Sequence, residues 1–401
     1  MGNVLIFGVI VLNTEKKYLK TLLIFLSYLL VAVVAMSVAF VVFFRHYGDV
    51  SKLEQLEAVI LNQFIGEADK TAMEDGAAAG MVAALGDRWS YYIPASEYEA
   101  YQQQMNNSYV GVGITISLNE DNYLDILKVE PNGGAKEAGI LPGDVLVKVE
   151  GEDVAQLGMD KTSEMVRGAE NTDVKLTVSR NGEEKTFTVT RKTIQVAVAE
   201  GKMLDNNIGL VKIANFDARC AQETIEAIAQ LVEQGATALI FDVRNNPGGY
   251  RHELVALLDY LLPKGTLFRS VSTDGKEEVD TSDKSCLELP MAVLINGESY
   301  SAAEFFAAAL QEYEWAITVG EATCGKGYFQ TTIELMDGSA VGLSVGKYFT
   351  PKGVSLAEVG GLKPNVEVKV KESVAADIYA GVLSPEKDPQ IQAAIQALQG
   401  E

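Results

Sequence analysis

The sequence predicts an α/β protein that carries a separate β-rich segment and one membrane-spanning helix near its N-terminus. Three observations support this fold class. An apolar run without charges covers residues 21–44, alternating apolar and polar residues dominate 105–192, and strand and helix patterns take turns over 193–401. A chain of 401 residues is long enough to form two or three units that each bury a core.

The apolar run over 21–44 predicts a single-pass membrane anchor. As a helix that rises about 1.5 Å per residue, it would reach roughly 36 Å, enough to cross a bilayer. Lys16, Lys17 and Lys20 precede it, and basic flanks tend to stay in the cytoplasm. The run ends in phenylalanines and not in small residues, which disfavours a cleaved signal peptide. We therefore expect a cytoplasmic N-terminus over 1–20 and an extracytoplasmic remainder at the cell membrane.

The composition disfavours several kinds of partner. The formal net charge is −22, and the acidic excess lies beyond the N-terminal span, which argues against nucleic acid and anionic lipid. The three cysteines, Cys220, Cys286 and Cys324, are odd in number and lack metal-ligand spacing. We expect neither a disulfide framework nor a metal site.

Residues 45–104 are expected to form a short helical region. The tetrapeptides Ser-Lys-Leu-Glu at 51–54 and Thr-Ala-Met-Glu at 71–74 both have capping-box spacing, which predicts two helix starts. One face of the first helix is apolar and carries Leu53, Leu56 and Ile60. That face would serve either packing within the chain or a homodimer contact.

The segment 105–192 should form a small β-rich domain. Turn sequences rich in Gly, Pro and Asn separate its alternating runs. The expected strands are 110–117, 124–129, 145–149, 174–178 and 186–190.

The segment 193–401 has the strand and helix rhythm of an α/β layer. Apolar residues at helical spacing predict a helix at 224–234, and another should begin at Ala302. The expected strands, some wholly apolar as in a buried parallel sheet, are 208–213, 238–243, 291–295, 316–319 and 342–350.

Ser301 occupies the junction between an expected strand and an expected helix. Ser301 and Glu304 have capping-box spacing, so the serine would cap the helix. The same position suits a nucleophile, because the amide of Ala302 at the positive helix end can stabilise an oxyanion. The two roles are compatible.

A serine nucleophile needs a base, and the chain has only two histidines. His46 abuts the expected membrane span, and His252 is better interpreted as the start of a surface helix. Lys326, between two glycines and beside aromatic residues, is the other candidate. Its pKa would have to fall by about three units to act near neutral pH, which requires local burial to outweigh the acidic charge of the chain.

The β-rich segment resembles a PDZ domain of the bacterial protease kind. Gly-Val-Gly-Ile at 111–114 matches the carboxylate-binding loop, and 131–146 matches the long signature after it. Alone, these glycines would equally permit a tight turn. The resemblance implies that a peptide C-terminus is held by the backbone of Gly111, Val112, Gly113 and Ile114 and adds as a strand beside them.

The chain from about 50 to 399 resembles the C-terminal processing peptidases, a family of serine-lysine proteases. Ser301 matches the nucleophile of the family, Lys326 matches the base, and Gln330 matches the residue that orients the lysine. The resemblance implies a crotonase-like core over 193–401, an inserted PDZ domain, and no cofactor.

Further matches and departures complete the resemblance. The segment 239–249 matches a second signature, whose turn implies that Gly248 joins Ala302 in the oxyanion hole. Asp242 and Arg244 are expected to pair within that turn, and Arg167 is a candidate contact between the PDZ domain and the active site. The departures are at Tyr300, Ala303, Glu312 and Cys324, and they bear on cleavage preference.

These expectations define an extracytoplasmic serine endopeptidase, anchored to the lipid bilayer by 21–44, whose substrates are proteins or peptides with free apolar C-termini. The alternative is a catalytically silent PDZ scaffold that tethers envelope proteins. A crotonase-like acyl-CoA enzyme shares the α/β rhythm, but the anchor and the PDZ signature disfavour it.

Overall fold

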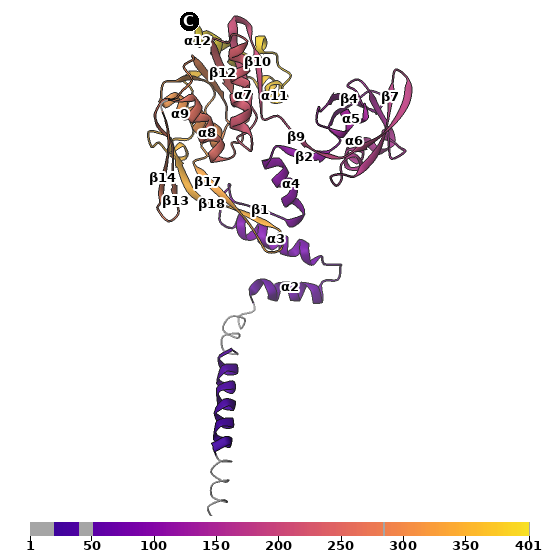
Figure 1. The fold of residues 1–401 in the computed structure, drawn as a ribbon, viewed down its shortest axis with the longest axis vertical. Coiled ribbons are helices and arrows are strands. Elements are labelled where there is room, and N and C mark those ends of the chain that lie inside the picture. Colours follow the sequence, from indigo (N-terminus) through magenta and orange to yellow (C-terminus); the bar gives the residue numbers. More distant parts are fainter. Residues whose placement is uncertain (1–19, 40–50, 284, 401) are drawn as a thin grey trace, which may run out of the picture. The chain divides into compact units, whose positions relative to one another are not determined.

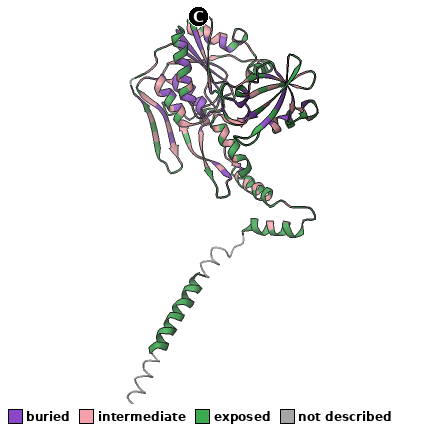
Figure 2. Cartoon of the chain, turned by 45° about the vertical axis from the view of Figure 1, so that its right-hand side comes forward, coloured by how far each residue is buried: buried purple, intermediate pink, exposed green. Residues whose placement is uncertain are grey.

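The computed structural model describes residues 20–39, 51–283 and 285–400, and it contains two units, Met1–Met81 and Val82–Glu401 (Figure 1). In the first unit the helix Lys20–Ala39 is long and apolar enough to cross a membrane, and all of it is exposed (Figure 2). Its length and composition suit either a membrane anchor or a signal sequence. Residues 40–44 of the expected span and the lysines at 16 and 17 lie outside the described residues.

The first unit also contains α2 (Lys52–Gln63) and most of α3 (Lys70–Ala83). The predicted capping box at α2 is confirmed, because the Ser51 amide donates to Glu54 and the Glu54 amide donates to Ser51 Oγ. The second box is wrong. Helix α3 begins before Thr71, and Asp69 accepts the amide of Ala72.

The β-rich segment forms an antiparallel sheet in the order β3-β4-β5-β7-β8, with β6 paired to β5. Its elements are β3 (Ile114–Leu118), β4 (Leu124–Val129), α5 (Gly134–Ala138), β5 (Val145–Val149), β6 (Glu152–Asp153), α6 (Val154–Val166), β7 (Asp173–Arg180) and β8 (Glu183–Thr190). Buried Val, Leu and Ile side chains from these elements form a core of their own. Strand β3 lies at one edge of the sheet.

The predicted strand 110–117 is two strands. Strand β2 (Ser108–Gly111) ends before the left-handed Gly113 (φ 80°), and β3 follows it. Strand β2 pairs instead with β9 (Lys192–Gln195), so the chain enters and leaves the β-rich segment through one two-stranded ribbon. A side chain at 113 would also meet the backbone of Gly133.

The second sheet has the order β10-β11-β12-β15-β16-β19, and its pairs are parallel except for β10 with β11. The strands are β10 (Ala199–Met203), β11 (Ile208–Ile213), β12 (Ala238–Asp242), β15 (Met291–Ile295), β16 (Ala316–Gly320) and β19 (Val366–Glu367); the 3-10 turn η1 (Asp205–Asn207) joins β10 to β11. Strands β12 and β15 are buried along their whole length, as their apolar sequences predict.

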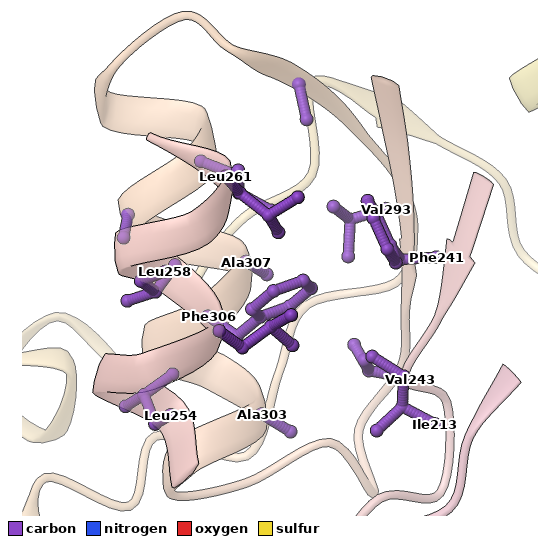
Figure 3. Packing of buried hydrophobic residues seen from close by; sticks show 14 of the residues in the cluster. Ile213, Phe241, Val243, Leu254, Leu258, Leu261, Val293, Ala303, Phe306 and Ala307 are labelled. Carbon is purple, nitrogen blue, oxygen red and sulfur yellow. The ribbon is translucent and has the colours of Figure 1, made fainter. Parts of the chain in front are cut away.

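Helices cover both faces of this sheet. On one face, α7 (Cys220–Glu233), α8 (Arg251–Leu261) and α9 (Ala302–Glu312) pack their apolar sides on the strands. Figure 3 shows Phe306 of α9 projecting toward Phe241 of β12, and the centres of these two rings are 5.4 Å apart. On the other face, α12 (Pro389–Gln399) packs on β12, β15 and β16. Helix α7 begins four residues earlier than predicted.

A third sheet is antiparallel in the order β1-β18-β13-β14, with β17 paired to β18. It contains β1 (Tyr91–Ile93), β13 (Gly265–Ser272), β14 (Glu277–Ser282), β17 (Tyr328–Glu334) and β18 (Ala340–Phe349). The remaining elements are α4 (Ala95–Met105), α10 (Leu356–Val359), α11 (Glu372–Tyr379) and η2 (Pro385–Lys387).

The predicted pairing of Asp242 and Arg244 is confirmed. Their side chains are buried and joined at 2.6 Å, and Arg244 also binds Asp388 at 2.9 Å. Since the second aspartate lies at the start of α12, this cluster ties the turn after β12 to the helix on the opposite face of the sheet.

Candidate active site

Ser301 is the residue before α9, at the end of the loop that follows β15. Its backbone is strained, with φ 58° and ψ −127°, in a region that side-chain-bearing residues rarely adopt. It is 7% exposed. The turn places Ser301 at the N-terminus of a buried helix, where the amide of Ala302 has no intrahelical partner.

Glu304, three residues into the helix, joins Ser301 to the loop of Lys326. One carboxylate oxygen accepts the amide of Ser301 at 2.9 Å and the amide of Lys326 at 2.8 Å. The other oxygen accepts the Thr323 hydroxyl and the Gly325 amide, both at 2.6 Å. Because Glu304 is fully buried, burial raises its pKa, and these four donors oppose that rise.

Lys326 lies among aromatic rings. Its Nζ is 4.8 Å from the ring centre of Trp89 and 5.9 Å from that of Tyr300. Burial lowers the pKa of Lys326 to about 8, although Glu304, Cys324 and Asp87 oppose that shift. This is the direction that a lysine base requires, and its cause is the desolvation expected from the sequence.

Gly248 packs directly against Ser301. A Cβ at Gly248 would lie 2.7 Å from the Ser301 Cβ and 2.8 Å from the Ala302 nitrogen, so only glycine fits, and its φ is 87°. The structure therefore brings the two predicted oxyanion residues, Gly248 and Ala302, to the serine. The amide of Gly248 donates to Asn246 Oδ1 at 2.9 Å.

Gln330 is in β17, directly after a register shift in its pairing with β18. Its amide nitrogen donates to Ser344 Oγ at 3.0 Å and to the Tyr328 carbonyl at 3.4 Å. Within the described residues, no hydrogen bond joins Lys326 Nζ to Gln330 or to Ser301. The structure thus brings the backbones of Ser301 and Lys326 together, and it directs Gln330 toward Ser344.

His252 lies in α8 with its side chain 74% exposed, stacked on Tyr250 with ring centres 5.1 Å apart. Its Nε2 is 3.6 Å from Glu253. These contacts agree with the expectation that it begins a surface helix.

A cavity of about 940 Å³ opens beside the ring of Trp89. The segment 85–90, which includes Trp89, forms one wall, and β13, β17 and β18 contribute the others. Ser344, the partner of Gln330, also lines this space.

The predicted carboxylate-binding loop is the connection between β2 and β3. Val112 is buried, and its carbonyl accepts the amide of Ala135, while Gly113 accepts the amide of Glu130. Arg167 follows α6, and its positive charge opposes the rise that burial causes in the pKa of Tyr109, a residue of β2. The described contacts of Arg167 include none with the predicted catalytic residues.

Arg219 fastens the ribbon to the core. Its guanidinium donates to the carbonyls of Asn106 and Val196, each at 2.8 Å, and to Glu223 at 2.8 Å. The first two residues flank β2 and β9. Arg219 therefore binds the chain both where it enters the β-rich segment and where it leaves it.

Sequence reasoning missed Trp89 and underestimated Glu304. Nothing local marks Trp89, because its partner Lys326 is more than two hundred residues away. The signal for Glu304 was present, since its spacing from Ser301 predicts a cap, but burial and the contacts to Thr323 and Gly325 depend on the fold.

Comparisons with known proteins find similar sequences and a similar fold. The profile of peptidase family S41 matches residues 207–368, and a PDZ profile matches 126–180. The carboxyl-terminal-processing protease of Synechocystis sp. is 32% identical over 338 residues, which cover 82% of this chain and 77% of that protein. The carboxy-terminal processing protease CtpA of Bacillus subtilis is 33% identical over 326 residues, covering 80% of this chain and 69% of that protein. A solved structure assigned as an S41 protease of Bacteroides fragilis has a similar fold, with a TM-score of 0.53, 16% identity, and coverage of 86% of this chain and 97% of that one.

Proposed function

The chain belongs to peptidase family S41, among the carboxyl-terminal processing proteases, and on that premise we propose that it is a serine endopeptidase with Ser301 as nucleophile and Lys326 as base. The observation that carries the assignment is the Glu304 carboxylate, which binds the amides of both residues. Burial of Lys326 supports the role of base, because it favours the neutral amine.

In the proposed reaction, neutral Lys326 takes the hydroxyl proton of Ser301 while the serine oxygen attacks the scissile carbonyl. The resulting oxyanion accepts hydrogen bonds from the amides of Ala302 and Gly248. Protonated Lys326 then delivers its proton to the leaving amine, and an acyl-enzyme forms. Water hydrolyses this ester with Lys326 again as base.

Three groups must rearrange for this chemistry. The amine of Lys326 must turn from Trp89 toward Ser301, and the amide of Gly248 must release Asn246. Gln330 must leave Ser344 if it is to orient the lysine.

The proposed substrates are proteins with free apolar C-termini. The loop Gly111–Ile114 would hold the terminal carboxylate, and the edge strand β3 would pair with the peptide. We assign the PDZ domain to 105–192, inserted ahead of a crotonase-like core at 193–401. The helix Lys20–Ala39 supports anchoring in the cell membrane with the catalytic part outside.

Cleavage of a protein substrate by purified variants tests the assignment. Ser301→Ala and Lys326→Ala should each abolish proteolysis while retaining the fold, and His252→Ala is the control that retains most activity. Labelling by a serine-reactive probe should depend on Ser301, which separates a peptidase from a silent PDZ scaffold. A folded but inactive His252→Ala enzyme would contradict the lysine assignment.

A further inference from the structure

Asp217 is a buried carboxylate that the proposed reaction does not use. It lies in the turn between β11 and α7, and only 6% of the residue is exposed. Its backbone amide donates to Asn215, but in the part of the chain that the structure describes its carboxylate has no hydrogen bond or ion pair. Buried carboxylates are usually paired, because an unpaired buried charge is costly.

Within the residues that the structure describes, no basic side chain pairs with this carboxylate. Burial raises the pKa of Asp217 to about 7. Arg219, two residues along, directs its guanidinium to Glu223 and to backbone carbonyls. Arg251 in α8 is held by Glu278 and Asp280. Among the described residues, Asp217 therefore has neither a cation nor a hydrogen-bond donor, and its carboxylate oxygens are not fully enclosed, so a ligand could supply both.

The backbone of Asp217 lies close to that of Ser301, the proposed nucleophile. The amide of the preceding Phe216 donates to the Gly248 carbonyl at 2.6 Å, and a Cβ at Gly249 would lie 2.6 Å from the Asp217 nitrogen. Gly248 also packs against Ser301. Adjacent paired backbones are about 5 Å apart, so two such steps place Asp217 within roughly 10 Å of Ser301, the length of about three extended residues.

Tyr250 lies near the Asp217 carboxylate, and other tyrosines lie near Tyr250. The pKa of Tyr250 is raised by burial and by the nearby Asp217, Tyr91 and Tyr98. The hydroxyls of Tyr91 and Tyr101 are 2.8 Å apart, and the rings of Tyr98 and Tyr101 are stacked. Ring faces attract cations and accommodate the alkyl stem of a long basic side chain.

We propose that Asp217 is a specificity-determining residue that binds the basic side chain, lysine or arginine, of a substrate residue near the scissile bond. An ammonium or guanidinium group supplies both the charge and the donors that the carboxylate lacks. The net charge of −22 adds a general attraction for cationic peptides. This inference rests on the proposed peptidase function and adds a substrate preference to it.

The test compares peptides in which lysine or norleucine replaces, one position at a time, the residues that flank the cleaved bond. Norleucine keeps the alkyl stem and removes the charge. At one position the full-length enzyme should prefer lysine by roughly tenfold or more in kcat/KM. Asp217→Asn should bring this ratio near one, and Asp217→Glu, which keeps the charge, should retain a preference. The matched control Asp205→Asn removes an exposed carboxylate and should leave the ratio unchanged.

Binding of the same peptides to the Ser301→Ala chain, followed by fluorescence anisotropy, separates this inference from the proposed chemistry. A lysine preference in Kd that Asp217→Asn removes supports the site even if no peptide is cleaved, and a total absence of cleavage would then count against the peptidase function alone. Equal cleavage and binding of lysine and norleucine peptides at every position would overturn the assignment, as would a lysine preference that survives Asp217→Asn.

Discussion

Replacing Lys326 with methionine should stabilise the fold while it abolishes proteolysis. Burial lowers the pKa of this lysine from its ordinary value of 10.5 to about 8. Each pKa unit corresponds to about 1.4 kcal/mol, so keeping the amine charged at pH 7 costs the folded state about 3 kcal/mol. The cation–π contact of the ammonium with Trp89 offsets up to about 1 kcal/mol of this cost. Methionine has a similar length and no charge, so Lys326→Met should raise the free energy of unfolding by about 2 kcal/mol.

The sign of the pH dependence follows from proton linkage. Below pH 8 the amine is charged in both states, and the full cost is present. Between pH 8 and 10.5 the unfolded state binds more protons than the folded state, so the stability contributed by this site rises with pH. The gain in free energy of unfolding from Lys326→Met should therefore be constant below pH 8 and should shrink as pH rises from 8 toward 10.5.

Urea unfolding of the full-length chain and of Lys326→Met, measured across this pH range in the same detergent, checks the argument. Proteolysis by the wild-type enzyme should rise about tenfold per pH unit below 8 and level above it, as the neutral amine accumulates. A variant that is less stable at pH 7, or a stability difference that does not change with pH, would refute the buried-lysine reasoning. So would a rate profile that titrates near 6.5 and changes in His252→Ala.

Three other predictions concern the positioning of the site, substrate selection and topology. Glu304→Gln should cut proteolysis more than tenfold and lower the free energy of unfolding by about 3 kcal/mol. The reason is that the new amide nitrogen would face two of the four hydrogen-bond donors that the carboxylate accepts. A variant with normal stability by urea unfolding would contradict this. Amidation of a substrate C-terminus should weaken binding by about 1.5–3 kcal/mol if the loop Gly111–Ile114 holds the carboxylate, and equal cleavage of acid and amide peptides would exclude C-terminal recognition. Protease added to cells stripped of wall or outer membrane should digest the folded portion and leave a small protected fragment, whereas protection of the whole chain would invert the proposed topology.

Local sequence patterns predicted the bounds of several strands and the start of one helix. The strands at 124–129, 145–149, 208–213 and 291–295 have the predicted bounds, because the alternation or apolar continuity of a strand is a property of neighbouring residues. The start of α9 after Ser301 was predictable for the same reason, since a helix cap involves residues three positions apart. Thr71 has the same spacing but lies inside α3, because Asp69, two residues earlier, accepts the amide of Ala72 at the start of the helix.

The sequence by itself determined the elements, the apolar helix near the N-terminus and the resemblance that singles out Ser301 and Lys326. Only the tertiary structure decided that the ring of Trp89 lies beside Lys326 and that Glu304 accepts the backbone amides of Ser301 and Lys326. It also decided that Gln330, after a register shift in β17, donates to Ser344. It also left Asp217 buried beside the glycine turn, with no partner for its carboxylate in the described part of the chain. The physical reason is that burial and hydrogen bonding between distant segments depend on how whole elements pack, whereas a sequence pattern records the interactions of residues a few positions apart.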